Sequence, residues 1–313
     1  MSILLLFLDG VGLGQPDPAT NPLVAAELPN LRGLLGGQGL VAGTPATQTE
    51  RAVFIPTDAN LGVEGPPQSA TGQATILTGL NVPRINGAHW GPKPNAAIAE
   101  LLRRDNVFRR LTQRGQTAAL LNAYPQRYFD AVNSGRRNYS AIPLAVTAAG
   151  LRLFTTGDLL AGNALSADFT GEGWPDGSAP HYSAHEAGQK LAALAAGYDF
   201  AFFEFWLSDY MGHRGSLDEA RGILERLDAV VGGLLAAWDD AAGLIVITAD
   251  HGNLEDLSQR HHTRNRVPTF VIGRARQAFA EGLTDLTGFT PAILEALLDA
   301  PSPTVYHGLQ GTI

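Results

Sequence analysis

Five short apolar runs, each bounded by turn-forming residues, recur along the chain and predict the strands of a sheet. Near-continuous apolar runs of about four to eight residues are typical of strands that are buried on both faces. The runs cover residues 3–8, 117–122, 200–207, 243–249 and 267–272.

Helical periodicity lies between these runs, over residues 96–114, 183–196 and 216–239. The second and third segments each open with a serine followed three residues later by a glutamate, which is the pattern of a capping box. Near the C-terminus, Thr290 before Pro291 predicts a helix with Thr290 as its N-cap. Because strands and helices alternate, we expect a three-layer α/β/α fold with a mainly parallel central sheet.

The stretch from about residue 124 to residue 181 breaks this alternation. It is rich in Arg, Tyr, Gly and Asn, and its periodicity is weak. We expect a small cap, inserted over the edge of the sheet, and not an independent domain. The expected organisation is therefore a single domain over residues 1–313 that contains this cap.

Composition narrows the classes of protein to which the chain can belong. Of its 313 residues, 45% are hydrophobic and 17% are charged, which is typical of a globular protein with an ample core. The net charge of −8 and the lack of a basic run argue against nucleic acid as the main partner. The chain has no cysteine, so disulfides, thiolate metal sites and cysteine nucleophiles are excluded.

The apolar run at the N-terminus is expected to be a core strand. It is too short to span a bilayer, and no basic residues flank it. It leads directly into Asp9 and Gly10, as a strand that ends at a turn would. We therefore expect a cytoplasmic protein without a membrane partner.

Side chains with metal-binding groups follow several of the predicted strands. Asp250 and His251 stand directly after an apolar run, and His262 follows in the next segment. Open α/β sheets place their sites where strands end, and such oxygen and nitrogen donors suit a hard-to-borderline divalent metal ion. Similar residues follow the first and third runs: Asp9, Asp209 and His213.

Each of these residues has an ordinary explanation when it is taken alone. Asp9 before a glycine is typical of a turn, and Asp209 four residues before His213 is typical of a surface pair on a helix. Ser69, in a segment that also contains Gly72, is expected to cap a helix. The same position would otherwise aim its hydroxyl at a helix N-terminus, where backbone N–H groups suit a phosphate.

Taken together, these residues are better explained by one site at one edge of the sheet. Two divalent metal ions about 3.5–4 Å apart form a clamp for in-line phosphoryl displacement, and seven donors are enough to hold both. The expected oxygen-rich set is Asp9, Ser69, Asp250 and His251, and the expected nitrogen-rich set is Asp209, His213 and His262.

Ser69 is the expected nucleophile of this site. A neighbouring ion would lower the pKa of its hydroxyl, and a covalent phosphoserine would form and pass to water or to another hydroxyl. The remaining charge on the phosphoryl oxygens needs hydrogen-bond donors. We expect the backbone N–H groups of Thr71 and Gly72, together with an arginine, to supply them.

The motifs that carry these residues resemble those of the alkaline phosphatase superfamily. They are LDGxG from residue 8, the glycine-containing helix start at Ser69, DxxGH from Asp209, TADHGN from residue 248 and HTxNxVP from His262. Within the superfamily, the resemblance is closest to the catalytic core of cofactor-independent phosphoglycerate mutase and phosphopentomutase, and it extends over nearly the whole chain. It implies the ligand roles above, Ser69 in preference to Thr71 as nucleophile, and two Mn²⁺ or Zn²⁺ ions.

The chain departs from the mutase pattern in three places. The large inserted phosphotransferase domain of the mutase has far fewer residues to correspond to it here, Gln73 replaces a histidine of the family, and a lysine before residue 180 has no counterpart. We therefore expect a phosphatase or phosphodiesterase that acts on a small phosphorylated metabolite. The alternatives are an intramolecular phosphomutase on a small phosphosugar or phosphoglycerate-like substrate, and a metal-stabilised binding protein without turnover.

Four arginines are candidates for contact with the substrate. Arg84 follows the helix predicted to carry the nucleophile, and three others lie in the expected cap among tyrosines. Solvated surface arginines are the ordinary explanation, whereas a planar guanidinium also suits a second phosphate. The cap residues are Arg127, Arg136 and Arg137.

Overall fold

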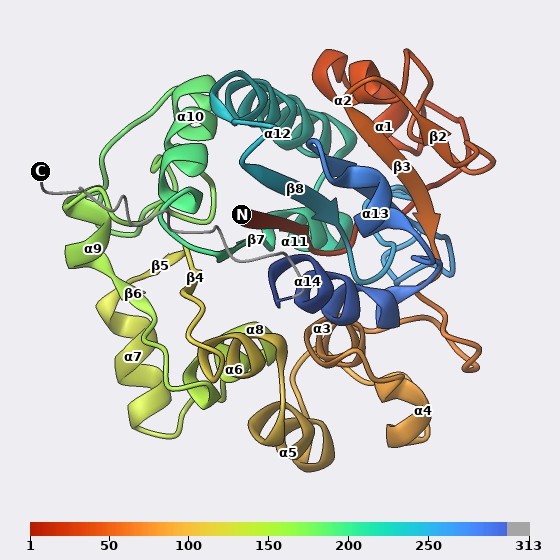
Figure 1. The fold of residues 1–313 in the computed structure, drawn as a ribbon. Coiled ribbons are helices and arrows are strands. Elements are labelled where there is room, and N and C mark those ends of the chain that lie inside the picture. The colour runs from red at the N-terminus through yellow and green to blue at the C-terminus, as the bar shows by residue number, and fades with distance from the viewer. Residues whose placement is uncertain (299–313) are drawn as a thin grey trace, which may run out of the picture.

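The computed structural model describes residues 1–298 of the chain. A seven-stranded sheet passes through the molecule in the order β2-β3-β9-β8-β1-β7-β4 (Figure 1). The five predicted strands are all present, together with two that the apolar pattern missed. The strands are β1 (Ser2–Leu8), β2 (Thr47–Gln48), β3 (Ala52–Thr57), β4 (Ala118–Leu120), β7 (Phe200–Phe205), β8 (Gly243–Thr248) and β9 (Val267–Ile272).

The sheet is parallel on one side of the fold and antiparallel on the other. β1 pairs in parallel with both β7 and β8, and β7 pairs in parallel with β4. β9 runs antiparallel to β8, and β3 and β2 continue with antiparallel pairing. The expected mainly parallel sheet is therefore only partly confirmed, because its parallel part is the four strands β8, β1, β7 and β4.

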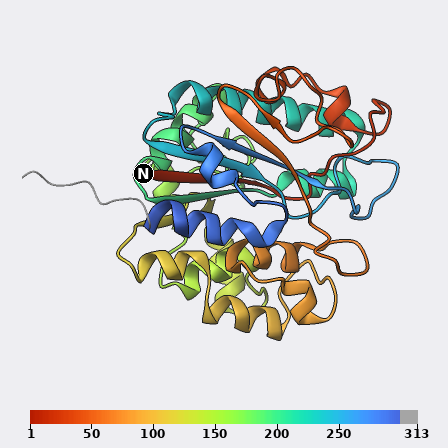
Figure 2. The same ribbon diagram turned by 45° about the vertical axis from the view of Figure 1, so that its right-hand side comes forward.

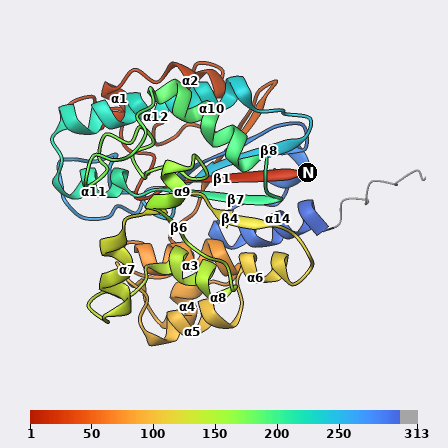
Figure 3. The same ribbon diagram turned by 90° about the vertical axis from the view of Figure 1, so that its left-hand side faces the viewer.

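Helices cover both faces of the sheet, as expected for a three-layer α/β/α fold. On one face, α10 (Ala184–Ala195) packs along α12 (Leu217–Ala237), with α1 (Pro22–Ala25) and α2 (Pro29–Leu34) against α12 (Figure 2). Helices on the other face pack against one another (Figure 3). They are α3 (Ser69–Thr78), α5 (Ala96–Arg104), α6 (Val107–Thr112), α8 (Ala141–Ala148) and α14 (Phe289–Leu298).

β1 lies inside the sheet, between β8 and β7. Residues 3–7 of β1 are completely buried, because β1 has neighbouring strands on both edges and helices above and below. Complete burial of one large apolar side chain contributes about 1.5–3 kcal/mol. Packing on every side therefore fixes β1, which ends directly before Asp9.

The predicted helices are present, but two of their details differ from the prediction. Both capping boxes are present, since Ser183 and Ser216 each accept from the backbone N–H of the glutamate three residues later. The predicted helix over residues 96–114 is broken into α5 and α6, because Asp105 is extended and Asn106 caps the second helix. Thr290 is not an N-cap; it lies inside α14, and its hydroxyl donates to the carbonyl of Ile76.

The segment over residues 124–181 contains short elements near the carboxyl end of β4. β5 (Ala123–Tyr124) pairs with β6 (Phe154–Thr155) in a separate two-stranded sheet, and α7 (Gln126–Asn133) and α9 (Thr156–Leu160) lie on the same side of the molecule (Figure 3). In contrast, α8 from this segment packs against α5 and α6. Its role as a cap stays a prediction.

The remaining short elements connect the layers: α4 (Val82–Asn86), α11 (Leu207–Arg214), α13 (Arg276–Ala280) and the 3₁₀ turn η1 (Leu286–Gly288). Across residues 1–298, no helix is long and apolar enough to cross a membrane.

Candidate metal centre

The structure brings the seven predicted donors to the carboxyl ends of the parallel strands. Asp9 follows β1, and Asp250 and His251 follow β8. Asp209 and His213 lie on α11, which begins directly after β7. Ser69 is the first residue of α3, and His262 lies in the loop between β8 and β9. Residues that are far apart in sequence thus meet because the strands that carry them are neighbours in the sheet.

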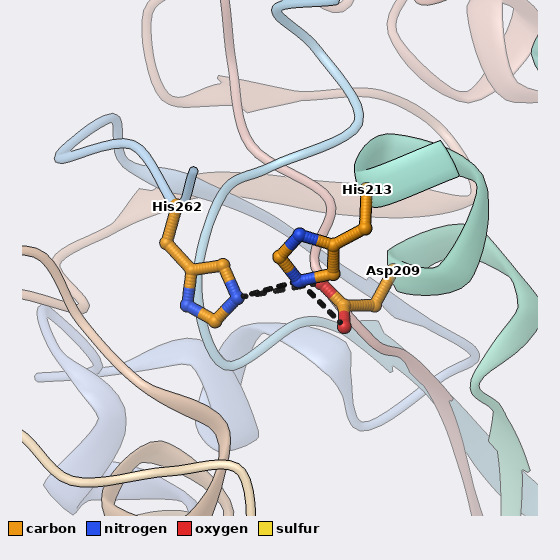
Figure 4. A group of neighbouring side chains, drawn as sticks. All are labelled: Asp209, His213 and His262. Atoms are coloured by element: carbon orange, nitrogen blue, oxygen red, sulfur yellow. Dashed lines mark hydrogen bonds and ion pairs between the residues drawn. The ribbon is translucent and has the colours of Figure 1, made fainter. Parts of the chain in front are cut away.

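The nitrogen-rich set forms one tight group, in which Asp209, His213 and His262 point toward one another (Figure 4). The Nε2 atoms of His213 and His262 are 3.2 Å apart. The carboxylate of Asp209 lies 3.4 Å from His213 Nε2 and 3.6 Å from His262 Nε2. These separations suit three ligands around one small cation.

In His213 and His262, the hydrogen bond of Nδ1 shows that Nε2 is the nitrogen that faces the metal position. Nδ1 of His213 is 2.9 Å from the carbonyl oxygen of Arg260, and Nδ1 of His262 is 2.9 Å from that of Pro67. A carbonyl only accepts hydrogen bonds, so each Nδ1 carries the proton and each Nε2 presents a lone pair. Two ring nitrogens that face each other at 3.2 Å beside a carboxylate suit a shared cation, and the residues therefore fit a metal ion.

The oxygen-rich set gathers around His251. Its Nε2 atom lies 3.1 Å from Ser69 Oγ, 3.4 Å from Asp9 Oδ1 and 3.6 Å from Asp250 Oδ2. Its Nδ1 atom is 3.3 Å from the carbonyl oxygen of Gly252, the arrangement also seen in the other two imidazoles. Asp209 groups with Asp9 and His251 as well as with the nitrogen-rich set, so it lies between the two.

Two buried carboxylate oxygens of the oxygen-rich set lack a hydrogen-bond partner in the described part of the chain, Asp9 Oδ1 and Asp250 Oδ2. Burial raises the pKa of Asp9 well above its usual value, and the charge of Asp250 raises it further. Burial likewise raises the pKa of Asp250, with a further contribution from Asp209. A divalent cation at this position would remove the repulsion and restore the ionised carboxylates.

In the nitrogen-rich set, the pKa values of Asp209 and His262 are lowered instead. Burial opposes ionisation of Asp209, but hydrogen bonding with His213, the charge of His251 and the amide of Asn253 outweigh it and lower the pKa of the carboxyl group. Burial lowers the pKa of His262 to about 4, and the charge of His251 acts in the same direction. A neutral imidazole is the form that binds metal ions, so burial favours His262 as a ligand.

Ser69 does not cap the helix that it begins. The N-cap of α3 is Gln68, whose side chain makes no capping hydrogen bond. The Ser69 side chain is buried and its hydroxyl meets His251 instead. The ordinary explanation of this serine as a helix cap is therefore wrong.

The backbone groups expected to bind a phosphate are already occupied. The N–H of Thr71 donates to the carbonyl of Trp90 at 3.0 Å, and the N–H of Gly72 donates to that of Gln68 at 2.9 Å. Because both N–H groups already donate to carbonyls, the expectation that they bind a phosphate is wrong. Gln73, where the mutase pattern has a histidine, donates from Nε2 to Asp9 Oδ2 at 3.4 Å.

Two glycines allow the close packing of the donors. Gly10 has a φ of +67°, and a Cβ atom on it would lie 2.6 Å from Asp209 Oδ1. A Cβ atom on Gly72 would lie 2.8 Å from the carbonyl oxygen of Asp250. Any side chain at either position would displace a donor.

Glu255 is a residue of the site that the motifs alone did not single out. It is completely buried and accepts from the backbone N–H groups of Gly12, at 2.9 Å, and Asn253, at 2.8 Å. It also accepts from the hydroxyl of Thr263 and the amide of Asn265. Glu255 thus joins the loops after β1 and β8 to the segment that carries His262, and Thr263 and Asn265 of HTxNxVP hold it in place.

Asn253 was also missed as a separate residue, although TADHGN contains it. Its Nδ2 donates to Asp209 Oδ1 at 2.7 Å. The motif contains Asn253, but its partner Asp209 follows β7 and not β8, so the sequence alone did not show their contact.

The four candidate arginines are not gathered at the metal centre. Arg127 and Arg137 line a cavity at the ends of β4 and β7. Arg136 is exposed and donates to Ser134, and Arg84 is exposed on α4 with a guanidinium nitrogen near Gly62. The structure thus gives Arg136 and Arg84 no place in either the metal centre or this cavity.

The chain is similar to known proteins in sequence and in fold. The model of the metalloenzyme superfamily matches residues 174–298, which include five of the seven donors but neither Asp9 nor Ser69. The 2,3-bisphosphoglycerate-independent phosphoglycerate mutase of Methylobacillus flagellatus is 33% identical over 138 residues, 41% of this chain and 26% of the mutase. That of Dinoroseobacter shibae is 35% identical over 139 residues, 41% of this chain and 27% of the mutase.

The chain therefore matches about a quarter of the length of these relatives. Among solved structures, the PH0037 protein from Pyrococcus horikoshii aligns over 95% of this chain and 96% of its own, with a TM-score of 0.57 and 18% identity. At that identity the likeness is one of fold. The family-model match and the mutase relatives confirm the resemblance of the motifs to the alkaline phosphatase superfamily.

Proposed function

We propose that the chain is a binuclear metal-dependent enzyme that hydrolyses a small phosphate ester through phospho-Ser69. The observation that carries the proposal is the position of the Ser69 hydroxyl, 3.1 Å from His251 Nε2 at the start of α3. A serine that neither caps its helix nor faces solvent, but meets a group of carboxylates and imidazoles, has surroundings that support a role as nucleophile.

Metal ions supply Lewis-acid stabilisation of the phosphoryl oxygens and of the leaving oxygen when they are bound. We assign one ion to Asp209, His213 and His262, and the other to Asp9, Ser69, Asp250 and His251. Asp209 lies between the two sets, which favours two adjacent ions. Manganese or zinc suits this mixture of imidazole and carboxylate.

The chain's own groups determine the course of the displacement. A bond forms between Ser69 Oγ and phosphorus while the ester bond breaks, and the alcohol leaves with a proton. Water then breaks the serine–phosphorus bond and releases inorganic phosphate, so the net reaction is hydrolysis of one ester bond. The N–H groups of Ser69 and Ala70 have no backbone acceptor within residues 1–298, and we expect them to bind the phosphoryl oxygens in place of those of Thr71 and Gly72.

The test is release of phosphate from a generic aryl phosphate by protein loaded with Mn²⁺ or Zn²⁺. We expect Ser69→Ala to lower the rate by about 10³-fold or more while the protein retains bound metal. Ser134→Ala, which removes an exposed hydroxyl at the C-cap of α7, is the matched control. An unchanged rate for Ser69→Ala would show that the serine is not the nucleophile.

The second candidate is an intramolecular phosphomutase, favoured by the named activity of the mutase relatives. The first step is the same, but the phosphoryl group passes from Ser69 to another hydroxyl of the substrate. A labelled phosphosugar distinguishes the two functions. Label that moves within the sugar without the release of phosphate would replace hydrolysis by the mutase reaction.

A further inference from the structure

A cavity of about 610 Å³ opens at the carboxyl ends of β4 and β7, beside the candidate metal centre. Its volume lies within the range of about 300–1,000 Å³ typical of small-molecule sites. Leu207, which lines it, stands two residues before Asp209 on α11. The segment over residues 124–181 supplies much of its wall, including Tyr124, Arg127, Tyr128, Arg137 and Trp174.

Glu204 brings a buried carboxyl group to this cavity. Its main chain is fixed on both sides by Asn122, which accepts from the Glu204 N–H at 2.7 Å and donates to its carbonyl at 2.9 Å. The residue is 7% exposed. Burial raises the pKa of Glu204 to about 7, while Arg137 and the Tyr124 hydroxyl act to lower it.

Two further polar groups of the wall lack a partner in the described residues. They are the Tyr128 hydroxyl and the Trp174 indole N–H, in side chains that are 8% and 7% exposed. Asp168, which also lines the cavity, is different, because Thr170, Gly171 and Gly173 donate to its carboxylate. A buried unpaired donor costs about 1–3 kcal/mol, so Tyr128 and Trp174 are suited to a bound partner.

The combination of these groups selects the chemistry of the ligand. An anionic group is disfavoured, because it would meet the carboxyl group of Glu204. A quaternary ammonium is also disfavoured, because it would leave the indole N–H of Trp174 unpaired and would lie near the charges of Arg127 and Arg137. A hydroxyl group both donates to a carboxylate and accepts from an indole N–H. Aromatic walls also suit the apolar face of a polyol or sugar.

We infer that this cavity binds the hydroxyl-bearing organic part of the substrate, so that the enzyme acts on a polyol or sugar phosphate. Glu204, Tyr128 and Trp174 bind hydroxyl groups of the substrate, and the phosphoryl group reaches Ser69 at the adjoining strand ends. Arg127 and Arg137 give the mouth of the cavity a positive charge that attracts a phosphorylated molecule. The inference rests on the proposed function for its reaction, but the binding of the polyol part can be measured separately.

The experiment compares sorbitol 6-phosphate with methyl phosphate, which carries the same ester group without the polyol. With metal-loaded protein, we expect kcat/KM for sorbitol 6-phosphate to be at least tenfold higher. Glu204→Gln and Tyr128→Phe should each reduce this ratio about tenfold, through a higher KM for sorbitol 6-phosphate. Tyr139→Phe, which removes a hydroxyl from a ring that neighbours Tyr128 outside the cavity wall, is the matched control.

Calorimetric titration of the metal-free protein with sorbitol 6-phosphate gives a readout that does not depend on turnover. We expect the wild-type protein to bind it at least tenfold more tightly than Glu204→Gln does. Equal kcat/KM for the two esters, or equal binding by both proteins, would overturn the inference and leave the proposed function intact. If neither ester were hydrolysed while binding still required Glu204, the proposed function would fail and the cavity assignment would stand.

Discussion

Nε2 of His213 and Nε2 of His262 lie 3.2 Å apart, while Nδ1 of each ring is held by a main-chain carbonyl. The two imidazoles are thus aimed at one point by hydrogen bonds on their outer sides. Asp209 approaches the same point from α11, which makes this group a preformed tridentate site.

Removal of metal should therefore destabilise the folded protein. At ion concentrations of about 100 times Kd, binding contributes about 2.7 kcal/mol, which corresponds to a rise in Tm of roughly 4 °C for a chain of 313 residues. We expect EDTA to lower Tm by at least that amount in the wild-type protein and by less in His262→Ala, which keeps only the oxygen-rich set. His261→Ala, the neighbouring exposed imidazole, is the control and should keep the full response in a thermal-shift measurement.

Gly10→Ala should disrupt the site through contact as well as through backbone strain. The new Cβ atom would meet Asp209 Oδ1 at 2.6 Å. Gly37→Ala separates the two effects, because Gly37 also has a positive φ, of +90°, but has open space around it. Both variants should lose about 1–2 kcal/mol from the left-handed conformation. Only Gly10→Ala should also lose metal affinity, by tenfold or more in equilibrium dialysis, and similar affinities in the two variants would contradict the steric role.

Glu255→Gln should weaken metal binding although Glu255 is not a proposed ligand. Its carboxylate accepts from the N–H groups of Gly12 and Asn253 and from the Asn265 amide. Residues that support ligands in this way typically change metal affinity about 10–100-fold. Glu281→Gln removes an exposed carboxylate and should change nothing. Metal affinities measured with a chromophoric chelator test this, and equal values for the two variants would exclude the supporting role.

The stability of the protein should depend on pH through Glu204. Burial raises the pKa of its carboxyl group from near 4.5 to about 7, so the folded state holds more protons than the unfolded state between these values. Stability from this residue therefore falls as pH rises through that window, by up to roughly 3 kcal/mol. Glu204→Gln should become more stable relative to wild type as pH increases from 5 to 8 in urea unfolding of the metal-free protein, and a constant difference would refute the assignment.

Much of the site could be predicted, because its donors follow strands that the apolar pattern of the sequence predicts. The apolar runs placed β1, β7 and β8, and adjacent parallel strands bring their carboxyl ends together. β3 escaped the pattern because it is not a continuously buried run: only Ala52, Phe54 and Thr57 of its six residues are buried.

The supporting residues could not be predicted in the same way. Glu255 is defined by what it accepts from three separate segments, and only the folded chain brings these segments together. Ser69 presented the reverse problem, because the local pattern of a serine at a helix start favoured a cap. Its true neighbour, His251, lies 182 positions away, beyond the reach of any local rule.

The central position of β1 also has a consequence for folding. Both strands that flank β1 begin about 200 residues or more further along the chain, so its pairing closes loops of that length before any hydrogen bond of the central ladder forms. The two ends of the metal centre cannot meet until these late contacts are made. Metal uptake during refolding should thus report the pairing of β8, and a nascent chain that stops before β8 will have Asp9 without Asp250, His251 and His262.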